Sequence, residues 1–227
     1  MANPQDFDKL NILKRRSLPY EEYFGVMLLS KKQKKDREDM SFILEDILML
    51  MFEVMQTGIE MNALDETAIK QEFTYQLYDA VEGKNFFVDE SQQYRYITNL
   101  VDETYRATIE NYTLHPYDYD YTGEKPYWLS GDRATFIAEN EANTLYNGSD
   151  YMDAIKSGKQ WKIWSDYGDD NVRPTHIEAN GLKIPIDDYF EVGNAQMLYP
   201  KDTTSEFSTA ASFPEEVINC RCSVIYV

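Results

Sequence analysis

The feature that most constrains the fold is a change of hydrophobic period along the chain. Between residues 66 and 81, apolar side chains recur at every fourth position, which places them on one face of an α-helix. Residues 91–111 repeat this spacing, whereas residues 217–227 alternate with the two-residue period of a β-strand. A chain whose period changes in this way is expected to fold as an α+β protein.

Helical patterns account for the N-terminal half. We predict helices at 41–56 (with a start at Asp39 or Ser41), 66–81 and 91–111. Asp65 is expected to cap the second helix, because its carboxylate can accept hydrogen bonds from free N–H groups. Three acidic residues interrupt the most apolar segment, which excludes a membrane span there. The half is therefore predicted to be all-helical.

The C-terminal half contains both helix and strand patterns. A helix is predicted to start after Ser130 and end near Tyr146, with a short helix from Asp150 to Gly158. Strands are expected at 160–166 and 217–227, and Asn180-Gly181 is the strongest hairpin signal. We predict a small mixed α+β module with an antiparallel sheet.

These patterns divide the chain into four segments, with the tyrosine-rich stretch as the connection. They are an N-terminal arm (1–38), a helical region (39–112), a tyrosine-rich connecting loop (113–129) and a C-terminal module (130–227).

Charge limits the partners that the chain can bind. The sequence has 22 basic and 40 acidic residues, a formal net charge of −18, so it repels a phosphate backbone over most of its surface. One basic cluster precedes the first predicted helix and consists of Lys31, Lys32, Lys34, Lys35 and Arg37. It is either a local contact for DNA or an acidic partner, or a solvated helix start. Such runs are usually solvated, which favours the second interpretation.

The two cysteines, Cys220 and Cys222, are two residues apart. In a strand both thiols would lie on one apolar face, with their Cα atoms roughly 6.5–7 Å apart, at or beyond the reach of a disulfide. They are either small buried hydrophobes or two ligands of one metal. An apolar face would raise the thiol pKa and make both inert.

A zinc site needs about four ligands. The candidates are His176, Cys220 and Cys222, with Asp166 or Asp170 as the fourth. The residues before Asn219, PEEVI, supply no further histidine. The residues therefore favour structural roles and no cofactor, with zinc as the alternative. Arg173 and Arg221 are expected to pair with Asp166, Asp169 or Asp170.

Several short motifs follow one another from residue 133 to residue 222. They are RATFIAENEANTLYN, a Lys-x-Trp strand at Lys162 or Lys159, a loop with Asp170, Val172, Arg173 and His176, then Gly181, Pro200 with Asp202, and NCRC at 219–222. In this order the set resembles the C-terminal domain of the phage Mu protein F-like minor head proteins, a family of tailed-phage head morphogenesis proteins. The signature positions are Arg133, Asp170, Arg173, His176, Gly181, Asn219, Cys220, Arg221 and Cys222.

The resemblance implies a minor capsid protein that associates with the portal vertex or the capsid interior. Its expected partners are the portal, major capsid or scaffolding protein, with roles in DNA packaging or ejection also open. Its expected location is the virion head, and the host cytoplasm during assembly. Neither a secretory signal nor a membrane partner is expected.

One branch of the family carries a cysteine pair where this chain has Arg173 and His176. Arg173 cannot ligate a metal, so this chain departs from that ligand set. The sequence has no phosphate-binding GxxxxGK[ST] or GxGxxG, no HExxH and no GxSxG, and we expect no enzymatic activity. The alternative is a metal-dependent hydrolase or a nucleotide-using transferase on the same module, with His176, Cys220, Cys222 and Asp170 as its centre.

Overall fold

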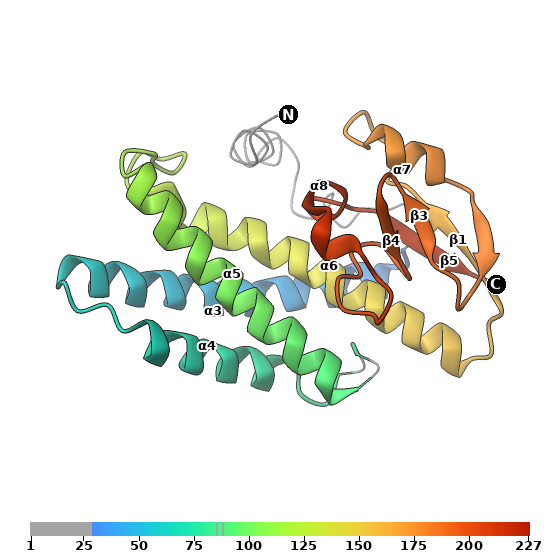
Figure 1. Cartoon of the computed structure of the whole chain (residues 1–227), viewed down its shortest axis with the longest axis horizontal. Helices are drawn as coiled ribbons and strands as arrows, with labels where there is room; N and C mark the ends of the chain where they lie inside the picture. The colour runs from blue at the N-terminus through green and yellow to red at the C-terminus, as the bar shows by residue number, and fades with distance from the viewer. Residues whose placement is uncertain (1–28, 85, 88) are drawn as a thin grey trace.

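Long helices form one part of the molecule, and short strands gather at one end of it (Figure 1). The computed structural model describes residues 29–84, 86–87 and 89–227. The long helices are α3 (Lys31–Glu60), α4 (Glu66–Val81), α5 (Glu90–Leu114) and α6 (Gly131–Lys156). Among them, α6 runs from the other helices to the strands (Figure 1).

The second predicted helix is confirmed with its cap. In α4, the Asp65 side chain accepts a hydrogen bond from the Ala68 N–H. The residues that recur at every fourth position are the buried ones, Ile69, Phe73, Leu77 and Val81. The third predicted helix is also confirmed, as α5.

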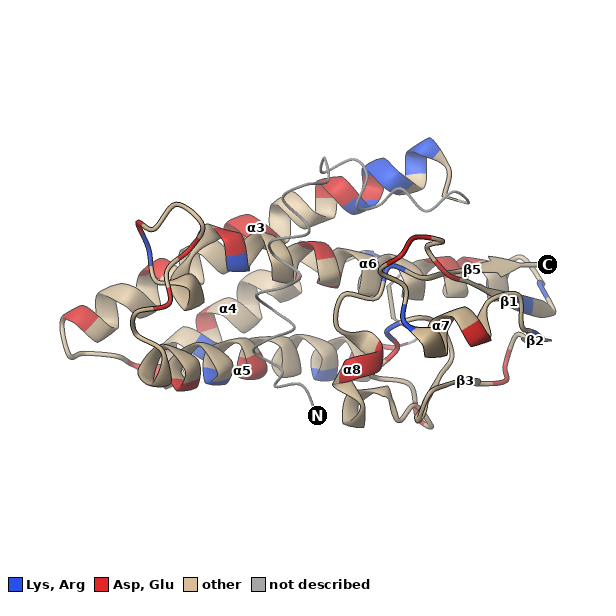
Figure 2. Ribbon diagram, turned by 90° about the horizontal axis from the view of Figure 1, so that it is seen from above, with Lys and Arg blue, Asp and Glu red and all other residues tan. Residues whose placement is uncertain are grey.

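The predicted start of the first helix, at Asp39 or Ser41, is wrong. Ser30 caps α3 through a capping box in which its side chain and that of Gln33 each bond the other's backbone N–H. The helix therefore begins at Lys31, and the basic cluster forms its first two turns (Figure 2). Residues 1–28 of the predicted arm lie outside the described residues.

The fourth helix is longer than predicted. Ser130 caps it as expected, but α6 continues through Gly148 to Lys156 instead of ending at Tyr146. A Cβ atom on Gly148 would lie 2.6 Å from the backbone oxygen of Phe86. The glycine therefore lets another segment approach the helix closely, and it does not end the helix.

The main apolar core spans both predicted halves. Four buried side chains of α6, Ala134, Ala138, Ala142 and Leu145, belong to the same hydrophobic cluster as those of α3, α4 and α5. The connection carries a short 3₁₀ helix, η1 (Tyr127–Leu129), whose Leu129 joins this cluster. The tyrosine-rich loop therefore does not separate two hydrophobic cores.

The strands form two small antiparallel units, as the α+β prediction requires. The central strand, β1 (Trp161–Ser165), pairs with β2 (Lys183–Pro185) and β5 (Ser223–Tyr226). A separate hairpin joins β3 (Phe190–Val192) to β4 (Ala195–Met197). Short helices α7 (Pro174–Ala179), η2 (Ala210–Ser212) and α8 (Pro214–Val217) lie between the strands in sequence. No helix in the described part of the chain combines the length and apolar character needed to cross a membrane.

Two predictions for this region are wrong. Asn180-Gly181 does not form a hairpin, because the residues before it form α7; Gly181, with φ of +80°, turns the chain from α7 toward β2. The strand predicted at 217–227 begins only at Ser223. Asn219 has φ of +58°, which no β-strand residue adopts, so Cys220 and Cys222 lie in a loop.

Candidate functional site

The NCRC segment, Asn219 to Cys222, is held against α6 by a row of asparagine side chains that we call the asparagine ladder (Asn140, Asn143 and Asn147). The Asn140 Oδ1 atom accepts a hydrogen bond from the Asn219 N–H at 2.9 Å. Asn143 Nδ2 donates to the Cys220 carbonyl at 3.1 Å, and Asn147 Nδ2 donates to the Cys222 carbonyl at 3.3 Å. The ladder thus pairs backbone groups that no strand partner satisfies.

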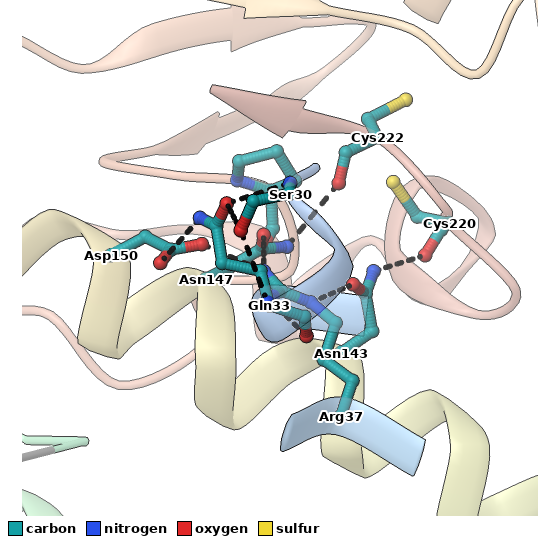
Figure 3. A network of polar contacts seen from close by, with 9 residues as sticks. Ser30, Gln33, Arg37, Asn143, Asn147, Asp150, Cys220 and Cys222 are labelled. Carbon is teal, nitrogen blue, oxygen red and sulfur yellow. Dashed lines mark hydrogen bonds and ion pairs between the residues drawn. The ribbon is translucent and has the colours of Figure 1, made fainter. Parts of the chain in front are cut away.

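Arg37 of α3 orients two side chains of this ladder, Asn143 and Asn147, from the other side (Figure 3). Its Nε donates to Asn143 Oδ1 at 3.3 Å, and one Nη donates to Asp150 Oδ2 at 2.8 Å and reaches Asn147 Oδ1 at 3.5 Å. Because a guanidinium only donates, it draws the amide oxygens toward itself. The amide nitrogens are therefore turned toward the carbonyls of the NCRC segment.

This position corrects the proposed DNA contact. Arg37 is completely buried, so it cannot reach a phosphate. Among the lysines of the cluster, Lys31, Lys32 and Lys35 are exposed and Lys34 is half-buried. Lys32 pairs with Asp36, and Lys35 pairs with Asp39. The basic cluster therefore consists of Lys31, Lys32, Lys34 and Lys35 alone.

The cysteine side chains point away from the ladder and meet His176 of α7. The Nδ1 atom of His176 lies 3.2 Å from Cys222 Sγ and 3.6 Å from Cys220 Sγ. Both thiols are buried and free. The sequence therefore identified three side chains that the fold brings together. Among the described residues, neither Asp166 nor Asp170 joins them within the 4.8 Å that contains their ligand atoms.

The other nitrogen of His176 contacts a carboxylate that the sequence did not single out. His176 Nε2 lies 3.1 Å from Glu216 Oε2, which also accepts a hydrogen bond from Thr175 Oγ1 at 2.8 Å. Glu216 is buried in α8, and a side chain at Gly193 would collide with its carboxylate. The pattern PEEV, with Pro214 at a helix start, predicts a short helix there, but it does not predict that Glu216 is buried against a histidine.

Proton affinities in this cluster are strongly perturbed. Burial alone would lower the pKa of His176, but its contact with Cys220 and the Glu216 charge raise it overall. Burial alone would raise the pKa of Cys220, yet hydrogen bonds from Cys222 and His176 hold it well below its usual range. Contact with Cys220, followed by burial, raises the pKa of Cys222. The expected rise of the thiol pKa is therefore found for Cys222 but not for Cys220.

Two of the three signature arginines, Arg173 and Arg221, line a small pocket beside the thiols. Arg221 pairs with Asp169 at 2.6 Å, as predicted, and its guanidinium lies 3.7 Å from the centre of the Tyr167 ring. Arg173 instead donates to the backbone carbonyl of Ile218. Asp170 is exposed and lies outside the cluster.

Arg133, another signature residue, lies in the helical core. It donates to Thr108 Oγ1 at 2.6 Å and to the Trp128 carbonyl at 3.2 Å. Its guanidinium also lies 5.1 Å from the ring centres of Phe52 and Trp128. It therefore joins α6 to α5 and to η1, and takes no part in the cysteine cluster.

Lys162 of the Lys-x-Trp strand is completely buried. Its Nζ donates to the Leu198 carbonyl at 2.7 Å and faces the Tyr151 and Phe190 rings. Burial lowers its pKa from 10.5 to about 8.

The family model described as phage Mu protein F like protein matches residues 101–225, more than half of the chain. No curated protein and no solved structure matches the chain. The matched segment contains the asparagine ladder and the NCRC segment. Helices α3, which carries Arg37, and α4 both precede it.

Proposed function

The chain belongs to the phage Mu protein F-like family, and from this we propose that it is a minor head protein of a tailed phage that attaches to the portal vertex or the inner capsid surface during assembly. The family implies a role in phage head morphogenesis with capsid partners. The observation that carries the proposal is the match itself, because it includes both α6 and the NCRC segment that α6 binds.

The outer face of α3 is the surface that we propose for partner contact. Ile43, Leu50 and Val54 are exposed there, although they are apolar, at 43%, 45% and 41% of their full areas. Their separations of seven and four residues place them on one face of the helix. Exposed apolar side chains that cluster in this way are typical of surfaces that bind another protein. We propose that this face docks on the portal, major capsid or scaffolding protein.

The proposal is tested by co-expressing the chain with the portal, scaffolding and major capsid proteins of its own phage and isolating the heads. We expect the wild-type chain to sediment with heads. Leu50→Glu and Val54→Glu should leave the helical circular dichroism unchanged but remove the chain from the heads.

The matched control is Tyr75→Glu on α4, an exposed side chain on a different helix, which should still sediment with heads. Heads that contain none of the wild-type chain, when all three partners are present, would contradict the proposed function. Loss of both α3 variants and the α4 control together would contradict only the proposed surface.

A further inference from the structure

We infer that His176, Cys220 and Cys222 bind a zinc ion, with Glu216 as the positioning residue for the histidine. The ligand atoms of the three residues lie within 4.8 Å of one another. In a tetrahedral site with Zn–S of about 2.3 Å and Zn–N of about 2.0 Å, neighbouring ligand atoms lie roughly 3.5–3.8 Å apart. The observed N–S separations, 3.2 and 3.6 Å, come close to this geometry before any adjustment.

The contact with Glu216 determines which ring nitrogen of His176 carries the proton. A neutral imidazole has one N–H and one lone pair. When Nε2–H donates to the Glu216 carboxylate, the lone pair lies on Nδ1, the atom that faces both sulfurs. A carboxylate is one of the usual partners of the remote nitrogen of a zinc-binding histidine, together with backbone carbonyls and water. The lone pair and the two sulfurs therefore converge on one point, as a cation requires.

The cluster also has the surroundings that a bound ion needs. It is buried, and the backbone of Cys220 and Cys222 is fixed by the asparagine ladder. The small pocket that Tyr167, Arg173 and Arg221 help to line adjoins the three ligands, so solvent can supply a fourth. The ion would join α7 to the NCRC segment, and the inference is independent of the proposed role in the head.

Metal content and cobalt substitution test the inference on the full chain, purified without a histidine tag. We expect inductively coupled plasma mass spectrometry to find about one zinc ion per chain. Replacement by Co²⁺ should give the absorption bands of tetrahedral cobalt together with a thiolate charge-transfer band. His176→Gln and Cys222→Ser should lose the metal, whereas His115→Gln, at the other histidine, should retain it.

Glu216→Gln separates a positioning role from general stability. It should still bind one zinc at saturation, but with affinity roughly 10–100-fold weaker, the usual effect of losing such a partner. Should the ligand variants fail to fold, the cobalt spectrum of the wild-type chain decides. A wild-type chain that takes up no zinc and gives no thiolate band with Co²⁺ would overturn the inference. If that chain still joined heads, the proposed function would stand.

Discussion

The helices and the strand-bearing end of this molecule are held together by different means. The helices α3 to α6 share one extended cluster of buried apolar side chains. Toward the strands the apolar clusters are smaller, and buried Lys162, Lys201 and Asp202 each contact backbone groups instead. Periodic apolar side chains therefore stabilise the helical region, whereas individual buried polar contacts contribute more to the region near the strands.

One helix belongs to both regions. On α6, the small apolar residues Ala134, Ala138 and Ala142 face the helical core. The asparagine ladder projects from the same helix toward the NCRC segment. We therefore expect damage to either set of contacts to be felt in the other region.

The largest effect is expected from the apolar side of this comparison. Phe52→Ala removes a side chain that is 1% exposed in the α3 core and lies beneath the Arg133 guanidinium. It should lower the free energy of unfolding by about 3–5 kcal/mol, as buried phenylalanine deletions do. Urea denaturation measures the change. Leu50→Ala, an exposed position on the same helix, is the control and should change stability little. Similar losses for both would mean that Phe52 is not in a packed core.

Among the polar contacts, the largest effect is expected from Asn147→Ala. It should lower the free energy of unfolding by about 1–3 kcal/mol, because it removes the donor to the buried carbonyls of Pro200 and Cys222. Thermal denaturation compares it with Gln71→Ala, an exposed amide on α4. Equal melting temperatures for the two variants would show that the ladder does not stabilise the NCRC segment.

The pH dependence of stability sharpens the same contrast. Lys162 has a pKa of about 8 in the folded chain, below 10.5 in the unfolded chain, because of burial. Between these values the unfolded chain binds more protons, so stability rises with pH. The free energy of unfolding should therefore increase by about 1 kcal/mol between pH 7 and pH 9. Lys162→Met should remove that part of the slope in urea titrations at several pH values. An unchanged slope would show that Lys162 is not the titrating group.

The smallest effect on folding is expected at the basic cluster. Changing Lys31, Lys32, Lys34 and Lys35 to glutamine should change the melting temperature little, since three of these side chains are exposed and Lys34 is only half-buried. Binding of duplex DNA is proposed to be weak, with a log–log salt slope of about −3.6 for four phosphate contacts. Fluorescence anisotropy measures it. Affinity that survives the quadruple change would place the DNA contact elsewhere.

The parts of the fold that could be predicted are those that repeat. The stripe from Ile69 to Val81 and the Asp65 cap located α4. The errors arose where one local contact overrode a pattern: the Ser30 capping box moved the start of α3, and the positive φ of Asn219 interrupted the expected strand.

Some residues of the candidate site could likewise be predicted from the sequence, and others could not. His176, Cys220 and Cys222 could be named as metal-ligand candidates because imidazole and thiol groups are common zinc ligands, and the fold brings the three together. Glu216 and Arg37 were missed in these roles, because a buried partner of a histidine or an amide has no spacing rule in the sequence. Arg37 belongs by sequence to the basic cluster, and its contacts with Asn143, Asn147 and Asp150, more than 100 residues away, show its place in the fold.

We expect α6 to make the helices and the strand-bearing end unfold as one unit. Native-state hydrogen exchange in low denaturant tests it most directly, by comparing backbone amides of α3 with those of β1 and β5. The slowest amides of both regions should exchange with the same free energy of opening, and Asn147→Ala should lower both free energies equally. Strand amides that exchange through a separate opening of lower free energy, while α3 stays protected, would contradict it.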